Sequence, residues 1–201
     1  MTSKLTEKKR LKREALFETA FDLFVTKGIT ETSISEIAAK ANVAKGTFYL
    51  YFKDKYDLRD KLIAERAGEL FDLATEALNK QVLPTLEEKV LFIVHSVIDS
   101  LNSNKILLRF ISKNLSWGVF HDMLVTGGIS EQDFTFYDAY KALLEESGRK
   151  FRNPDLMLYM IVELVNATCH NVILFQEPVT LEELKPELDG MICDILRRQE
   201  I

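Results

Sequence analysis

The chain is poor in cysteine and has no long apolar run. Cys169 and Cys193 are its two cysteines among 201 residues, and they fit neither a disulfide framework nor a paired metal motif. No apolar run reaches 18 residues, and the N-terminus is too polar for a signal peptide. We therefore expect a protein of the reducing cytoplasm that does not enter a membrane.

Features that mark common enzymes are also missing. The sequence has no glycine-rich phosphate loop, no nucleophile elbow and no metal-ligand spacing. The residues that could suggest catalysis are Cys169, His170, His95 and His121. Cys169 and His170 are neighbours on a predicted helix, so their side chains point apart. We expect no enzymatic activity, no cofactor and no metal ion.

Charge is distributed unevenly along the chain. The net charge is −5, with a pI near 5.4, which taken alone argues against binding to nucleic acid. Residues 1–66, however, hold 14 Lys and Arg against 10 Asp and Glu, and the remaining residues hold 12 against 21. Residues 4–13 form a basic arm, which is either a solvated tail or a contact to phosphate. A basic end on an acidic body is typical of a DNA-binding protein with a separate sensing body.

The apolar pattern has helical spacing throughout, with no alternating strand and no internal repeat, so we predict an all-α fold. Two short helices are expected between Ser33 and Phe52, and Asp54 is expected to cap a long helix that follows. The segment 117–129 is predicted to be an irregular loop. The first helix is predicted to end at Lys27-Gly28. The remaining helices are predicted to span Pro84–Asn104, Ile106–Leu115, Phe134–Glu146, Pro154–Phe175 and Pro186–Arg198.

The two short helices have the pattern of a helix-turn-helix. Ser33 and Glu36 form a predicted capping box, and the apolar residues that follow repeat with helical spacing. A break at residues 42–44 separates a second helix that turns only Phe48 and Phe52 toward the core. The remaining side chains of this helix then face outward, namely Lys45, Gly46, Thr47, Tyr49, Leu50 and Tyr51.

The stretch IAAKANVAKGTFYLYFKDKYDL closely resembles the helix-turn-helix signature of the TetR family of bacterial transcriptional regulators. The resemblance covers roughly residues 10–65. It implies a three-helix DNA-binding module over residues 1–54 and a helical effector-binding and dimerisation domain over residues 55–201. It also implies a repressor that a small-molecule ligand releases from double-stranded DNA. A regulator controlled by a protein partner, or an activator, is the alternative.

The resemblance assigns roles to single residues. Lys45, Gly46 and Thr47 match base-reading positions of the family, and Tyr49, Tyr51 and Lys55 match positions that contact phosphate. Leu50 is expected on the same DNA-facing surface, and the hydroxyl of Ser33 could donate to a phosphate. Ala44, Leu50 and Tyr51 depart from the commoner residues of the family, so the operator sequence stays open. A helical hairpin with incidental tyrosines is the alternative interpretation of this segment.

Aromatic residues gather around the predicted loop, and a polar stripe follows one face of the helix after Pro154. Together they suggest an effector pocket, although aromatics at helical spacing also build plain cores, and the polar stripe could lie in an interface. The candidate ligand-binding residues are Phe71, Phe110, Trp117, His121, Phe134, Tyr137, Asn166 and His170. We expect a small, largely apolar effector, and the acidic body with Glu163 mildly favours a cationic end.

A homodimer is expected because one chain presents only one reading helix. The helices Pro154–Phe175 and Pro186–Arg198 could form a four-helix bundle across a two-fold axis. The predicted interface is the apolar face of the first of these helices, with Val165 near its centre. Such a dimer would bind a pseudo-palindromic operator.

Overall fold

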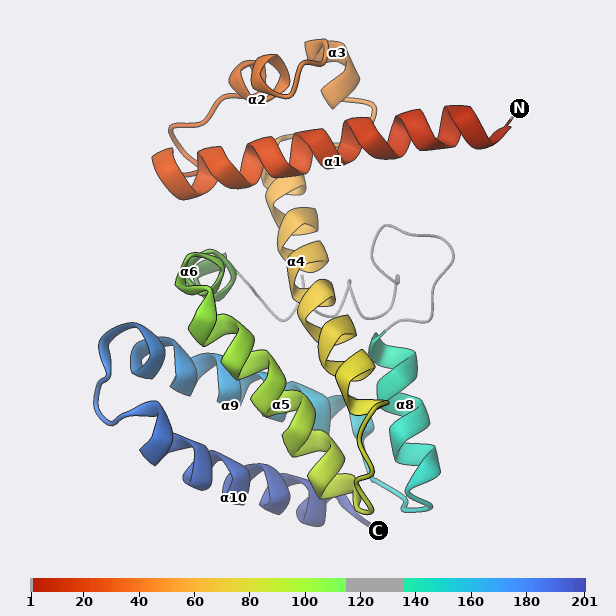
Figure 1. Cartoon of the computed structure of the whole chain (residues 1–201), viewed down its shortest axis with the longest axis vertical. Helices are drawn as coiled ribbons and strands as arrows, with labels where there is room; N and C mark the ends of the chain where they lie inside the picture. The colour runs from red at the N-terminus through yellow and green to blue at the C-terminus, as the bar shows by residue number, and fades with distance from the viewer. Residues whose placement is uncertain (1, 115–135) are drawn as a thin grey trace. The chain divides into compact units, whose positions relative to one another are not determined.

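The structure, a computed structural model, describes residues 2–114 and 136–201 (Figure 1). Within these residues the regular elements are α-helices, and the β-structure is one isolated bridge between Phe151 and Glu200. The all-α prediction is therefore confirmed. The predicted loop at 117–129 lies outside the described residues. The helices are α1 (Thr2–Lys27), α2 (Ile34–Lys40), α3 (Lys45–Phe48), α4 (Lys55–Leu78), α5 (Leu86–Ser103), α6 (Lys105–Asn114), α8 (Phe136–Glu146), α9 (Pro154–Phe175) and α10 (Leu181–Gln199).

The chain forms two compact units that divide inside α4, between Ala64 and Glu65. The sequence had placed the boundary after residue 54, at the start of this helix. The first unit extends further because Leu58, Leu62 and Ile63, in the first turns of α4, are fully buried. One continuous helix therefore supplies apolar side chains to both units.

The core of the first unit is built from α1, α2, α3 and the start of α4. The Phe52 ring lies 5.2 Å from the ring of Phe17 and 5.5 Å from that of Phe48, and all three side chains are buried. Helix α1 ends as predicted at Gly28, whose φ of +87° suits glycine and whose N–H donates to the Phe24 carbonyl.

Side-chain caps fix where the helices of this unit begin. Ser33 Oγ accepts a hydrogen bond from the Glu36 N–H at 3.1 Å, which confirms half of the predicted capping box. The Glu36 carboxylate instead pairs with Lys27 Nζ at 2.8 Å, because the end of α1 brings an ammonium group beside it. Asp54 caps α4 by accepting from the N–H groups of Tyr56 and Asp57, and these bonds lower the pKa of its carboxyl.

The second unit packs α5, α9 and α10 together, and α6 packs against α5 and α9. Helices α9 and α10, drawn in blue in Figure 1, contact each other along their lengths. Two side-chain contacts join α5 to α10. His95 Nε2 lies 2.7 Å from Asp189 Oδ1, and Lys185 Nζ pairs with Asp99 Oδ1 at 2.6 Å. The buried residues that these three helices share include Ile98, Met157, Ile173, Leu188 and Ile192.

Capping boxes start α5 and α10. Thr85 and Glu88 form the box of α5, next to the predicted start at Pro84, and Thr180 with Glu183 forms the predicted box of α10. Helix α10 begins at Leu181, so the prediction that Pro186 starts it was wrong. The capping box begins the helix earlier, and Pro186 costs it one backbone hydrogen bond near its N-terminus.

Candidate functional site

Six of the eight residues predicted to contact DNA lie in one segment of the first unit, residues 45–53, which is called the exposed segment below. Helix α3 is a single turn, and the chain continues in tight turns in which the N–H of Leu50 donates to the Thr47 carbonyl and that of Tyr51 to the Phe48 carbonyl. Phe48 is fully buried and holds the turn on the core. The intervening side chains are thereby turned to solvent.

Exposure differs from residue to residue along this segment. Leu50 is 80% exposed and Tyr49 53% exposed, while Thr47 and Tyr51 are half-buried. The Tyr49 ring stands edge-on to the Phe48 ring at 5.5 Å, which fixes its direction. The packing of the core of the first unit therefore does not explain why a leucine and a tyrosine are exposed to solvent in this segment.

The exposed segment begins and ends with a lysine. Lys45 and Lys53 are exposed, and their ammonium groups have no ion-pair or hydrogen-bond partner among the described residues, whereas Lys27 and Lys61 are paired with carboxylates. Lys53 was not predicted as a site residue, and only its position at the end of the segment could have indicated it. Lys55 Nζ donates to the Thr30 and Thr32 carbonyls at 2.8 and 3.0 Å, which leaves one of its three protons for another acceptor.

Gly46 and Ser33 also face solvent. A Cβ built on Gly46 would meet no atom within 4 Å, so the packing of the unit does not require glycine there. The Oγ of Ser33 is occupied as an acceptor at the start of α2, and its hydroxyl proton is left to donate outward. The eight residues predicted for this surface therefore come from the N-cap of α2, from α3 and the turns that follow it, and from the start of α4.

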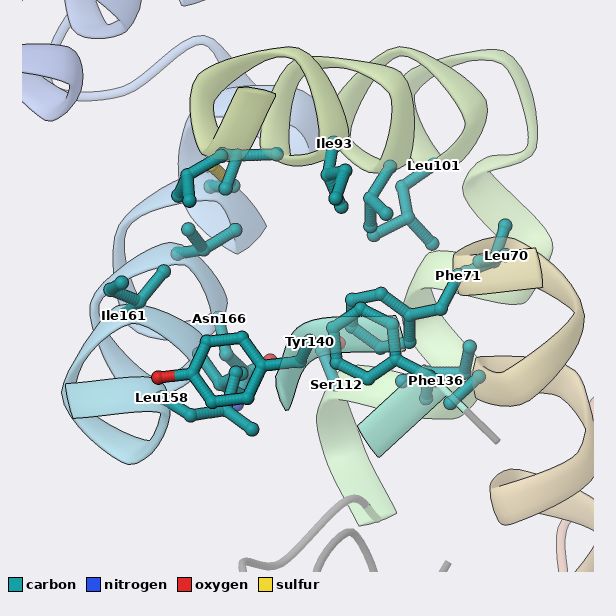
Figure 2. A pocket seen from close by; sticks show the side chains of 18 of the residues that line it. Leu70, Phe71, Ile93, Leu101, Ser112, Phe136, Tyr140, Leu158, Ile161 and Asn166 are labelled. Carbon is teal, nitrogen blue, oxygen red and sulfur yellow. The ribbon is translucent and has the colours of Figure 1, made fainter. Parts of the chain in front are cut away.

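A cavity lies in the second unit, between α4, α5, α6, α8 and α9 (Figure 2). It encloses about 1040 Å³ of space free of protein atoms, its open mouth included. No charged side chain lines it among the described residues. Its apolar lining includes Leu70, Phe71, Ile93, Val97, Leu101, Ile161 and Val165.

Few polar groups reach this cavity. Ser112 Oγ donates to the Leu108 carbonyl at 2.7 Å, and the Tyr140 hydroxyl donates to the Pro154 carbonyl at 2.8 Å. Burial raises the pKa of the Cys169 thiol, so it stays neutral at pH 7. Asn166 has no hydrogen-bond partner in the part of the chain that the structure describes, and it lies at the cavity wall in Figure 2. Its amide is therefore the polar group that remains available to a ligand.

Comparison with known proteins gives a family match for the first unit. The model for bacterial regulatory proteins of the tetR family matches residues 16–62, which include α2, α3 and the exposed segment. Residues 16–62 are therefore similar to the DNA-binding domain of the tetR family. It is 31% identical over 88 residues to the fatty acid metabolism regulator protein of Bacillus subtilis (strain 168), a match that covers 44% of each chain. The chain thus spans less than half the length of that relative.

Two solved tetR-fold structures match nearly the whole chain. FadR from Bacillus subtilis in complex with stearoyl-CoA has a TM-score of 0.63 and 20% identity, covering 89% of this chain and 96% of that one. The fatty acid degradation regulator FadR from Bacillus halodurans has a TM-score of 0.62 and 21% identity, covering 90% and 94%. Identity this low shows a shared fold.

The cavity of the second unit is lined by some of the residues predicted to bind an effector. Phe71 and Asn166 line it, and Phe71 stacks on Phe136 with ring centroids 4.1 Å apart. Phe136 and Tyr140 were not predicted, although both belong to the aromatic cluster that suggested a pocket. Trp117, His121 and Phe134 lie outside the described residues.

Three other predicted residues do not line the cavity. The Tyr137 hydroxyl donates to Asp155, so its neighbours in α8 supply the aromatic lining instead. His170 lies with Nδ1 3.0 Å from Asn171 Oδ1, and Phe110 is buried in the core. Glu163, whose carboxylate was expected to favour a cationic effector, is also absent from the lining.

Helix α9 exposes more apolar surface than a core helix should. An 18-residue window of it has a mean hydropathy of 1.5, enough by length and composition to cross a membrane, yet only 28% of the window is buried within the chain. Val165 and its apolar neighbours, predicted to form the dimer face, line the cavity instead. The outward apolar residues are Leu156, Tyr159 and Phe175 on α9 and Met191 on α10.

Proposed function

We propose that the chain is a homodimeric transcriptional repressor that binds double-stranded DNA and leaves its operator when an apolar effector binds. The observation that carries this proposal is the exposed segment, where aromatic, apolar and cationic side chains stand in solvent on a frame of buried phenylalanines. A soluble unit of this size gains nothing from exposing such a set unless a partner covers it. The family match to residues 16–62 supports DNA as that partner.

The chemistry of the segment suits a DNA backbone and groove. The unpaired ammonium groups of Lys45 and Lys53 and the hydroxyl of Tyr49 are groups that commonly bind phosphate. Gly46 lets the backbone come close, and Thr47 offers a hydroxyl and a methyl to base edges. Phosphate contacts would set the register, and Thr47 would contribute to sequence preference.

The apolar outer surface of α9 and α10 supports a homodimer. A helix that is apolar on all sides is normally covered on all sides, and the chain itself covers only part of α9. Two copies packed through α9 and α10 would bring the outward residues Leu156, Phe175 and Met191 into one interface. Two reading segments would then meet a pseudo-palindromic operator with half-sites about 34 Å or somewhat more apart.

The cavity supports an effector that is uncharged where it is buried. A charge placed among these apolar side chains would lose its hydration without gaining a counter-ion. Long acyl chains fit this requirement, and a FadR structure of the same fold is in complex with stearoyl-CoA. The Asn166 amide could bind one polar group of the ligand.

Helix α4 offers a route between effector and DNA. Its first turns carry Leu58 and Leu62 in the core of the DNA-binding unit, and its later turns carry Leu70 and Phe71 into the cavity wall. A ligand that displaces Phe71 would move the same helix on which the reading unit is built. Release of DNA then requires a ligand preference of a few kcal/mol for the state that does not fit the operator.

The proposal is tested by selecting bound fragments from random DNA duplexes with the full chain. We expect one enriched pseudo-palindromic sequence whose affinity falls steeply with salt. Tyr49→Phe should weaken binding to all sequences by a similar factor, and Thr47→Ala should also change base preference. If no sequence is enriched, or if neither substitution affects binding, the exposed segment does not read DNA.

A further inference from the structure

The exposed segment has little of the chemistry that reads bases by hydrogen bonds. Pairs of hydrogen bonds to base edges come from Arg or Lys to guanine, from Asn or Gln to adenine, and from acids to cytosine. Residues 45–51 contain Lys45 but no Arg, Asn, Gln, Asp or Glu. Most of what the segment presents is therefore apolar or aromatic.

Leu50 is the most conspicuous of these side chains. At 80% exposure it is the most exposed large hydrophobic residue described in the first unit, well above Tyr49 at 53% and Leu11 at 51%. Its neighbours Phe48 and Phe52 are buried, so the apolar character of position 50 is not needed for the core. An exposed leucine at position 50 would instead suit a binding surface that contacts an apolar group of its partner.

The position of Leu50 indicates which apolar group it would contact. Its N–H donates to the Thr47 carbonyl at 3.2 Å, so Thr47 and Leu50 lie one tight turn apart and place two apolar groups close together. The unpaired cations Lys45 and Lys53 stand before and after them in the chain. Between phosphates, the major groove offers one apolar group, the C5-methyl of thymine.

We infer that Leu50 is a specificity-determining residue that reads thymine through its C5-methyl group, with the Thr47 methyl beside it. This inference rests on the proposed DNA-binding function. It deepens that function by naming the base and the atom that are read. Loss of one buried methyl contact should lower the affinity of a half-site about fourfold.

The test uses the operator obtained by selection and replaces its thymines one at a time by deoxyuridine. Deoxyuridine pairs like thymidine and lacks only the C5-methyl. For the unmodified chain, we expect about a fourfold loss at one thymine of each half-site. Leu50→Ala should bind the thymine operator more weakly and should lose most of the preference for thymine over uracil at that position. Leu50→Met should keep the preference for thymine, because it keeps an apolar side chain there.

Tyr49→Phe is the matched control, since it should weaken the thymine and uracil operators by the same factor. Leu50 is exposed, so thermal unfolding of Leu50→Ala should resemble that of the parent chain. An unchanged ratio of thymine to uracil affinity in Leu50→Ala would overturn the inference and leave the DNA-binding function standing. Failure to enrich any sequence in the selection would overturn both.

Discussion

Gly46 and Leu50 are two residues of the exposed segment whose identity the fold of their own unit does not require. Nothing would touch a Cβ at position 46, and nothing in the unit covers the side chain at position 50. Phe48 and Phe52, by contrast, are fixed by the core. Apolar spacing predicted the two phenylalanines and the outward direction of their neighbours. It could not predict that Lys53 is unpaired, because ion pairing depends on which carboxylates the fold brings close.

Gly46→Ala should separate stability from DNA binding. Alanine favours a helix over glycine by about 1 kcal/mol, and no atom stands in its way, so the free energy of unfolding should stay level or rise by up to about 1 kcal/mol. Operator affinity should fall tenfold or more, on the order of 1.4 kcal/mol, because the added methyl keeps the backbone from the DNA. Chemical denaturation and fluorescence anisotropy would measure the two effects.

Glu76→Ala, an exposed change on α4, is the control and should leave operator affinity unchanged. If Gly46→Ala binds the operator as tightly as the parent chain, the backbone at position 46 does not approach DNA closely.

At the scale of helices, local signals predicted starts and stops well where the signal lies in neighbouring residues. The caps at Ser33, Asp54, Asn153 and Thr180 all form. The second half of the Ser33 box fails because Lys27, nine residues before Glu36, offers the carboxylate a better partner. The outward face of α9 was also assigned wrongly, because pattern alone does not show which apolar face meets a cavity and which meets solvent.

Charges placed on the outer surface of α9 and α10 should separate the subunits. Ala167 and Met191 are both exposed in the single chain, so Ala167→Arg with Met191→Glu should not disturb the core. Burying these charges in a dimer interface should cost several kcal/mol, and monomers should predominate in sedimentation velocity. Leu73→Glu, an equally exposed apolar site on α4, should leave the dimer intact. A double variant that remains a dimer of the same affinity would place the interface elsewhere.

At the scale of the whole molecule, the cavity draws its walls from helices that span residues 67–169. Each of the five helices α4, α5, α6, α8 and α9 has an apolar face. The pattern within one helix could not predict which residues of that face line the cavity. Phe71 and Asn166 were predicted from their type and position, while no role in the effector site was predicted for the apolar residues of α5. What the sequence did predict is the pairing of an acidic body with a basic end that reads DNA.

Filling the cavity should block the effector response without blocking DNA binding. Val165→Phe adds an aromatic ring inside the wall, so stearoyl-CoA should no longer raise the melting temperature or release the operator. For the parent chain, an acyl-CoA at 100 times its Kd should stabilise the fold by about 2.7 kcal/mol. Coenzyme A without the acyl chain should have little effect on either protein.

Val82→Phe, at a side chain that is 96% exposed, is the matched control and should respond like the parent chain. A normal response in Val165→Phe would exclude the cavity as the effector site. Operator binding that appears only after the ligand is added would reverse the sign of the proposed switch.

The length and hydropathy of α9 also have a consequence for folding during synthesis. The ribosome makes α9 before α10, so the helix emerges before the element that covers its inner side. At about 5–20 residues per second, the 19 residues of α10 follow over about one to four seconds. For that interval the nascent chain displays a segment with the length and hydropathy of a membrane span. The first unit can fold on emergence, whereas the second unit can bury the side of α9 that faces α10 only after α10 has been made.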